Sequence, residues 1–197
     1  MVARVARFLD QEATYEQVYY LYPAPGEPYG NLVSAEDWRA ADEDRRWYTH
    51  GVLSNPDPRF RLSPNLFTCL NFRKVLTTPA FKAYVSAVTG LPLGKLLGRT
   101  FHRMRVGDIL GPHSDEVKGR RLTFIVYLSP TWRADYGGAL HVIGKNDACS
   151  KIEATFNSLV VFDLTTQKLH YVADIRSTSG DRSRLTIGGW FCGPEHQ

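Results

Sequence analysis

The sequence predicts a mainly β fold, in which a jelly-roll-like double sheet is supported on one face by helices. After Leu93, short runs rich in β-branched and aromatic residues alternate with turn residues, as expected for strands. The runs are LLGRTFHRMRV, RRLTFIVYLS, GALHVI, KIEATF, SLVVFDL, LHYVADI and SRLTIGGWF. Strands of this length and spacing are typical of a sandwich or barrel, and not of alternating βαβ units. A chain of 197 residues fits a single domain with a sizeable core.

The first half of the chain carries the helical signals. Ser34, followed by Asp37, matches a capping box and predicts a polar surface helix over residues 35–48. Thr78 and Pro79 begin a second predicted helix, 78–89, whose apolar residues repeat at three- and four-residue spacing. A strand is expected before the proline- and glycine-rich stretch 22–31. We therefore expect one domain over residues 1–197, with helical support and flanking strands in 1–93 and the β core in 94–192.

Composition excludes several classes of protein. Hydrophobic residues make up 43% and charged residues 22% of the chain, which excludes global disorder. The net charge of +4 favours anionic ligands but is too small for a nucleic-acid-binding surface. No stretch approaches the roughly 20 apolar residues of a membrane span, and the N-terminus has no uninterrupted apolar signal region.

The cysteine pattern favours a reducing compartment. The three cysteines are widely spaced, show no CxxC motif and cannot all pair within one chain. We therefore expect a cytoplasmic protein that binds neither membrane nor nucleic acid. The sequence leaves its oligomeric state open.

The most informative motif is the triplet His113-Ser114-Asp115, which follows a Gly-Pro turn at the end of a predicted strand. In an extended strand, residues i and i+2 project to the same face. His113 and Asp115 can therefore present an imidazole nitrogen and a carboxylate oxygen to one metal ion. An HxD triplet alone is a weak signal, because such triplets are common by chance.

A third metal ligand has to come from a distant strand, and His170 is the candidate. It follows the apolar strand LVVF and begins the run HYVADI. Two neutral imidazoles and one carboxylate form the facial set associated with non-haem Fe(II) oxygenases. Zinc also accepts two histidines and a carboxylate, so the ligand types alone leave the metal open.

A candidate receptor for a carboxylate lies further downstream. Arg184 and Thr186 alternate on one predicted strand and so share a face. A guanidinium fork beside a hydroxyl group can receive a carboxylate. This pair predicts a dicarboxylate cosubstrate.

In this order, the motifs resemble those of the Fe(II)- and 2-oxoglutarate-dependent dioxygenase superfamily, in its prolyl-hydroxylase-like branch. The matching segments span residues 100–192: HSD, RRLTFIVYLSPTW, YGGAL, FNSLVVFD, His170 and RLTIGGWF. The resemblance implies a double-stranded β-helix, a fold of the jelly-roll or cupin-like type.

The resemblance also implies the site residues and the reaction. The iron ligands would be His113, Asp115 and His170. The residues that grip the distal carboxylate of 2-oxoglutarate would be Arg184, Thr186 and Tyr127. The implied reaction uses O2 to convert 2-oxoglutarate to succinate and CO2, and usually hydroxylates the substrate.

The sequence departs from the family pattern at two places. The interval between His170 and Arg184 is longer than usual in this branch, which predicts a longer hairpin turn and makes Arg182 an alternative to Arg184. We prefer Arg184, because Thr186 and Trp190 then keep the family's register. Arg105 stands where prolyl hydroxylases usually carry a pocket tyrosine, so their substrate does not transfer safely to this chain.

Several further residues are candidates with a structural alternative. Substrate or the C1 carboxylate of 2-oxoglutarate could be bound by Arg103, Arg105 and Arg120, whose alternative is a solvated strand edge. Trp132 is a candidate substrate contact, with core packing as the alternative. His102 and His141 lie in strand-like runs without a carboxylate at i+2, which favours a structural role.

These observations predict an Fe(II)/2-oxoglutarate oxygenase that hydroxylates a small anionic or zwitterionic molecule, such as an amino acid or a natural-product intermediate. The arginine cluster and the lack of an appended peptide-binding region motivate that substrate class. A protein or peptide hydroxylase of the prolyl type is the first alternative. A desaturase or cyclase on the same iron, and a jelly-roll binding module without turnover, are the others.

Overall fold

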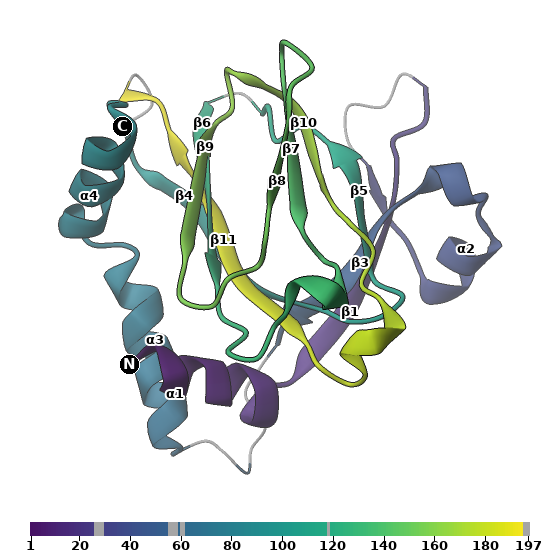
Figure 1. Ribbon diagram of the computed structural model, residues 1–197, viewed down its shortest axis with the longest axis horizontal. Coiled ribbons are helices and arrows are strands. Elements are labelled where there is room, and N and C mark those ends of the chain that lie inside the picture. Colours follow the sequence, from purple (N-terminus) through teal and green to yellow (C-terminus); the bar gives the residue numbers. More distant parts are fainter. Residues whose placement is uncertain (26–29, 55–58, 60–61, 118, 195–197) are drawn as a thin grey trace.

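The computed structural model describes residues 1–25, 30–54, 59, 62–117 and 119–194 (Figure 1). Its centre is a curled antiparallel sheet of 11 strands. The strands are β1 Tyr15–Leu21, β2 Asn31–Leu32, β3 Arg46–Leu53, β4 Leu96–Met104, β5 Ile109–His113, β6 Arg120–Tyr127, β7 Leu140–Gly144, β8 Cys149–Ile152, β9 Leu159–Asp163, β10 Gln167–Val172 and β11 Arg184–Cys192. Part of the expected loop 22–31, residues 26–29, lies outside the described residues.

Two four-stranded halves of the sheet are joined by β3. One half has the order β8-β7-β10-β5 and the other β4-β11-β6-β9. One edge of β3 serves both halves, because Tyr48 and Thr49 pair with β5 while Gly51 and Val52 pair with β4. The mainly β double sheet predicted from the sequence is confirmed. The strand that completes it comes from the N-terminal part of the chain, so β3 is a central strand and not a flanking one.

Side chains alternate between the two faces of the sheet and form two cores. On the outer face, Phe124 of β6 and Leu185 and Ile187 of β11 belong to the larger hydrophobic cluster. On the inner face, Met104 of β4 and Leu140 of β7 belong to a second cluster, to which both halves contribute. Residues that alternate with the outer core therefore point into the space between the two halves.

Helices cover the outer face of the β4-β11-β6-β9 half (Figure 1). They are α1 Val2–Arg7, which continues into a π-helical turn Phe8–Glu12, α3 Pro64–Val75 and α4 Pro79–Thr89. The predicted helix 78–89 is confirmed by α4. The Thr78 hydroxyl accepts a hydrogen bond from the Phe81 amide at 3.2 Å, and Gly90 ends the helix in the left-handed region, with φ +69°. No helix in the described ranges is long and apolar enough to cross a bilayer.

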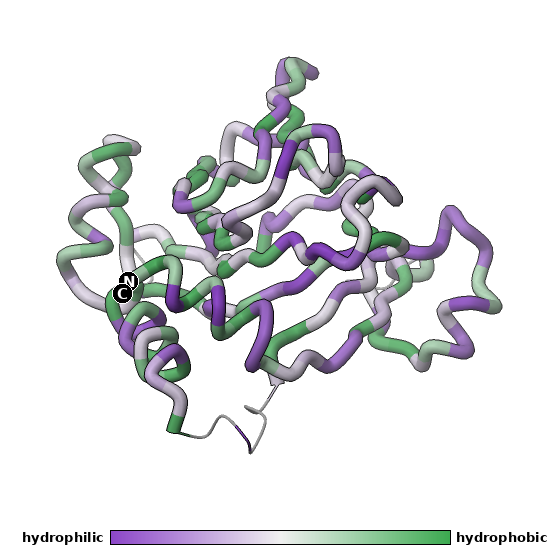
Figure 2. The backbone as a smooth tube through the Cα atoms, turned by 60° about the horizontal axis from the view of Figure 1, so that its bottom comes forward, coloured by the Kyte–Doolittle hydropathy of each residue, from purple (hydrophilic) through white to green (hydrophobic). Residues whose placement is uncertain are grey.

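The predicted helix over 35–48 is wrong in its second half. Helix α2, Ala35–Ala40, begins at Ser34 as expected, with the Ser34 hydroxyl accepting a bond from the Asp37 amide at 3.0 Å. The chain then turns and enters β3 at Arg46. Pairing of β3 with β1 overrides the local helical signal, and Tyr48 stacks on Tyr20 at 4.4 Å between ring centroids. Figure 2 shows hydrophilic residues around α2, which buries none of its own side chains.

Candidate metal and cosubstrate site

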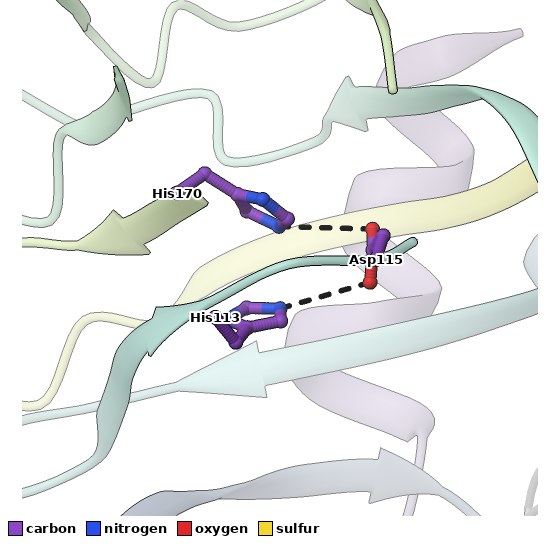
Figure 3. Close-up of side chains that lie close together, drawn as sticks. All are labelled: His113, Asp115 and His170. Carbon is purple, nitrogen blue, oxygen red and sulfur yellow. Dashed lines mark ion pairs between the residues drawn. The ribbon is translucent and has the colours of Figure 1, made fainter. Parts of the chain in front are cut away.

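Three metal-ligating side chains meet on the inner face where β5 ends. His113 is the last residue of β5 and lies opposite His170 of β10 in the antiparallel register. Asp115 follows in a turn, where its carbonyl oxygen accepts a hydrogen bond from the Val117 amide at 2.8 Å. Figure 3 shows both imidazoles directed at the Asp115 carboxylate. The HxD pair is thus brought together by a strand end and a turn, and not by one extended strand as we expected.

The donor atoms lie close enough together to share one ion. The Nε2 atoms of His113 and His170 are each 3.7 Å from an oxygen of Asp115, and the three donor atoms lie within 4.8 Å of one another. Burial, followed by the neighbouring His113, lowers the pKa of His170 to about 4, so its imidazole is neutral near pH 7. Burial works to raise the pKa of Asp115, but the two imidazoles and two hydrogen bonds lower it overall. Imidazole nitrogen and ionised carboxylate are the donors that Fe(II) accepts, so the residues fit that metal.

Each histidine is oriented by a carbonyl oxygen behind it. His170 Nδ1 lies 3.0 Å from the side-chain oxygen of Gln167, and His113 Nδ1 lies 2.9 Å from the backbone oxygen of Gly111. A carbonyl oxygen only accepts hydrogen bonds, so each Nδ1 carries the proton and each Nε2 keeps its lone pair for a metal. Gln167 is buried, and sequence reasoning missed it because only the structure shows which side chain lies behind His170.

Replacing Gln167 by leucine is expected to weaken Fe(II) binding by about 10–100-fold, because the acceptor that orients His170 is lost. Anaerobic calorimetric titration with Fe(II) measures the effect. Gln17→Leu is the matched control, since Gln17 bonds Thr49 and Asp108 away from the triad and should leave iron affinity unchanged. Iron affinity that stays at the parental value in Gln167→Leu would show that the contact does not matter.

Asp115 is held by two neighbouring strands. Its Oδ2 accepts hydrogen bonds from the Thr123 hydroxyl at 3.0 Å and the Trp190 indole N–H at 2.7 Å. Thr123 of β6 and Trp190 of β11 lie directly opposite each other in register, which aims both donors at one oxygen. The Arg120 guanidinium lies 3.8 Å from the other oxygen, Oδ1, and 3.7 Å from the centre of the Trp190 ring. The GGWF motif contained Trp190, but its role became visible only with the fold.

A second polar site lies deeper on the inner face, around Arg184. The Arg184 Nε–H donates to the Gly138 carbonyl at 2.8 Å, and an Nη–H donates to the Tyr127 hydroxyl at 3.3 Å. Thr186 lies directly opposite Tyr127 in register. Gly138 has φ +70°, and a Cβ there would come within 3.0 Å of the Arg184 side chain. A glycine is therefore required for this close approach.

The Arg184 guanidinium is a buried positive charge that a bound anion would stabilise. Its residue is 3% exposed, and burial lowers the pKa of the guanidinium. Among the described residues, no carboxylate lies within ion-pair distance of it. An unpaired buried cation is costly, so the arrangement is suited to a carboxylate that arrives with a ligand. Burial also raises the pKa of Tyr127, which keeps its phenol protonated. These residues fit one carboxylate of 2-oxoglutarate.

The alternative arginine, Arg182, lies elsewhere. Its guanidinium sits 5.4 Å from the centre of the Tyr136 ring and donates to the Ser179 carbonyl at 3.3 Å. The longer interval after His170 contains a 3-10 turn, Ser177–Ser179, before β11.

Two of the three arginines expected beside the metal motif, Arg103 and Arg105, lie away from the triad. Arg103 lies opposite Leu185, on the outer face, and stacks over Tyr15 at 4.2 Å. Arg105 is exposed past the end of β4 and donates to the Ser183 hydroxyl at 3.0 Å. The residue of β4 that touches Arg184 is Met104, at 3.8 Å from Sδ to Nη1. The expected cluster was wrong because strand alternation places Arg103 on the outer face and β4 ends before Arg105; of the three arginines, only Arg120 lies at the triad.

Trp132 is half-buried, and its contacts are those of a packing residue. Its indole N–H donates to the Gly137 carbonyl at 3.1 Å, and its ring meets Tyr136 edge-on at 5.6 Å. It is packed against the inner hydrophobic cluster. Its ring also lies beside Gly138, so it supports the backbone that receives Arg184.

Two histidines of the inner face, His170 and the half-buried His102, predict acid sensitivity of the metal-free protein. Burial lowers the pKa of His102 and His170 to about 4, whereas an unfolded histidine titrates near 6.5. Between these values the unfolded chain binds protons that the native protein does not, so the free energy of unfolding rises with pH across this window. We expect stability to fall as the pH drops from about 6.5 to about 4. Urea unfolding at several pH values checks this, and a flat profile would contradict it.

Part of the chain matches a known protein family. Residues 100–192 match the family model described as the 2OG-Fe(II) oxygenase superfamily. The chain belongs to this superfamily. Its members depend on iron(II) and 2-oxoglutarate, with O2 as oxidant, which are the groups that the triad and the Arg184 site fit.

Two curated relatives of this chain are prolyl hydroxylases by name. The chain is 33% identical over 120 residues to "Prolyl 3-hydroxylase OGFOD1" of Mus musculus, covering 58% of this chain and 22% of the mouse protein. It is 32% identical over 179 residues to "Prolyl 3-hydroxylase sudestada1" of Drosophila melanogaster, covering 84% of this chain and 31% of the fly protein. The chain thus aligns with less than a third of either relative.

A solved structure supports the fold over the whole chain. The crystal structure of a Pseudomonas putida prolyl-4-hydroxylase superposes with a TM-score of 0.51 at 20% sequence identity. The match covers 98% of this chain and 99% of that one. The architecture predicted as a double-stranded β-helix is therefore shared with a solved oxygenase.

Proposed function

We propose that this protein is a protein prolyl hydroxylase that uses Fe(II), 2-oxoglutarate and O2. The observation that carries the proposal is the similarity to two proteins named prolyl 3-hydroxylases, which extends over 58% and 84% of the chain. The geometry supports it, because the described residues include both a three-residue metal site and a buried guanidinium suited to a carboxylate.

The expectation of a small anionic or zwitterionic substrate was wrong. The relatives found by sequence are named for hydroxylating prolyl residues. The two arginines that motivated a small anion are also missing from the triad, since Arg103 lies on the outer face of β4 and Arg105 lies past the end of that strand, bonded to Ser183. The first alternative drawn from the sequence, a hydroxylase acting on protein or peptide residues, replaces it.

Two sets of residues have separate roles in the proposed reaction. His113, Asp115 and His170 would hold Fe(II), and Arg184 with Tyr127 and Thr186 would bind the distal carboxylate of 2-oxoglutarate. Bound together with O2, iron and 2-oxoglutarate supply the oxidising power to hydroxylate an unactivated C–H bond, with succinate and CO2 as the other products. The protein fixes the geometry of the ligands and excludes water from them.

Arg120 is the residue we assign to the substrate side of the site. Its guanidinium is stacked on Trp190 and faces Asp115, so it is held at the metal by contacts that leave it little freedom. A guanidinium presents several N–H donors in a fixed plane, and a peptide offers backbone carbonyl oxygens as acceptors. We propose that Arg120 binds a carbonyl oxygen near the target proline.

Succinate release tests the proposed function. The protein with Fe(II), 2-oxoglutarate and O2 is offered proline-containing peptides in one series and free amino acids and carboxylated metabolites in another. We expect peptides, and not free amino acids, to stimulate succinate formation, with Asp115→Ala as the inactive control. Stimulation by free small molecules alone would refute the proposal.

A further inference from the structure

A row of three side chains crosses the inner face of the sheet beside Arg184. Thr186 of β11 lies opposite Tyr127 of β6 on one side and opposite His102 of β4 on the other. Residues directly opposite in antiparallel strands share a face, with Cβ atoms about 4.5–5.5 Å apart. His102 therefore faces the same space as the two residues that we assign to the distal carboxylate of 2-oxoglutarate.

The position of His102 relative to the two cores confirms this direction. Its neighbours in sequence, Phe101 and Arg103, lie on the outer face, where Phe101 joins the outer hydrophobic cluster. Two positions on, Met104 belongs to the inner cluster and contacts Arg184. His102 shares the alternation of Met104, so its ring projects inward.

The His102 ring is neutral, and no described residue bonds its nitrogens. Burial, followed by the positive charge of Arg184, lowers its pKa to about 4, and the Asp115 charge opposes the shift in part. His102 is half-buried, and its ring centroid lies 4.7 Å from that of His50, which is buried. Within the described part of the chain, neither ring nitrogen of His102 has a hydrogen-bond partner. A neutral imidazole therefore brings one N–H donor into a space that holds a buried cation.

We propose that His102 is a binding residue for 2-oxoglutarate, and that its ring N–H donates a hydrogen bond to the carboxylate that Arg184 receives. This inference rests on the proposed use of 2-oxoglutarate at this site. A neutral donor suits the position, because a second cation beside the buried Arg184 would be repelled, whereas an imidazole adds a hydrogen bond to the anion without a charge. The structural role expected for His102 from the sequence is thereby extended to ligand binding.

Anaerobic calorimetric titration of the Fe(II)-loaded protein with 2-oxoglutarate tests the proposal. We compare the parent with His102→Leu, which removes the donor, and His102→Gln, which keeps an N–H donor. Loss of a hydrogen bond to a charged group predicts a rise of about tenfold or more in the dissociation constant of His102→Leu. His102→Gln should recover part of the affinity. His141→Leu is the control, since His141 lies on a strand of the same sheet and stacks on Tyr171 away from the triad.

Affinity for Fe(II) alone, titrated before 2-oxoglutarate is added, separates binding from a structural defect. The proposal predicts that iron affinity and thermal unfolding of His102→Gln match the parent, while the 2-oxoglutarate affinity of His102→Leu falls. If His102→Leu does not fold, the 2-oxoglutarate affinity of His102→Phe is measured instead, because phenylalanine keeps a ring but has no N–H donor. Parental 2-oxoglutarate affinity in the donor-free variants, or a parallel loss of iron affinity, would overturn the assignment. The titration uses no prolyl substrate. Its result can therefore be interpreted even if the prolyl-hydroxylase proposal fails.

Discussion

Replacing His170 by alanine is expected to weaken Fe(II) binding by more than roughly 100-fold. Mutating a residue that only hydrogen-bonds to a metal ligand costs up to about that much, whereas this change removes one of the three ligands themselves. His170 is 3% exposed, and its Nε2 lies 3.7 Å from an oxygen of Asp115, so the variant leaves a gap in a buried set of donors. Anaerobic titration with Fe(II) measures the loss, and turnover of 2-oxoglutarate should disappear with it.

His141→Ala is the control for this experiment. His141 is a strand histidine that stacks on Tyr171 at 4.8 Å and lies outside the triad, so its removal should leave iron affinity unchanged. Iron bound by His170→Ala as tightly as by the parent would show that the triad is not the metal site. Equal losses in both variants would point to a general effect on folding.

Arg184→Ala is expected to raise the apparent KM for 2-oxoglutarate strongly. Removing one partner of a buried, hydrogen-bonded charge pair costs on the order of 2–5 kcal/mol, with about tenfold in affinity for each 1.4 kcal/mol. Arg184 is buried, and bonds to Gly138 and Tyr127 hold its guanidinium in place, so the variant loses a positioned cation. Steady-state kinetics over a range of 2-oxoglutarate concentrations measure the effect.

Arg182→Ala serves as the matched comparison. Arg182 lies over Tyr136 and bonds the Ser179 carbonyl, so its loss should change the KM for 2-oxoglutarate little. The opposite ranking, with a large effect of Arg182 and a small one of Arg184, would transfer the carboxylate-binding role to Arg182.

The site residues that the sequence identified share one property: each belongs to an ordered motif whose spacing limits the choices. His113 and Asp115 come as a triplet, and the His170 imidazole lies at their side in the structure. Arg184 was preferred over Arg182 for its register with Thr186, and the structure places Arg184 at Tyr127. Their roles toward iron and 2-oxoglutarate stay predictions until the titrations above are done.

What the sequence could not supply was the set of contacts between distant strands. Thr123 and Trp190 bind the same oxygen of Asp115 only because β6 and β11 pair in one register. Gln167 orients His170 through a buried contact that has no signature of its own. Arg103 and Arg105 were misplaced for the same reason, since proximity in sequence to the metal motif determines neither the face of a strand, as for Arg103, nor where the strand ends, as for Arg105.

The helices that support the sheet were also predicted only in part. Helix α4 has strong local signals at both ends, in Thr78 and Gly90, and was predicted to within a residue. Residues 46–48 carry a helical pattern but form the start of β3, because pairing with β1 and stacking on Tyr20 outweigh local preference. Helix α3 was not predicted, although Ser63 caps it and Pro64 occupies its first turn.

The most direct test of the account is to follow oxygen from 18O2 into products. Total protein from the source organism, together with its separated small-molecule fraction, is incubated with the enzyme, Fe(II) and 2-oxoglutarate under 18O2, and peptides and metabolites are read by mass spectrometry. His170→Ala is run in parallel. We expect one labelled oxygen on a proline within a protein, present with the parent and absent with His170→Ala. Label found only in free metabolites, or equally with both proteins, would contradict it.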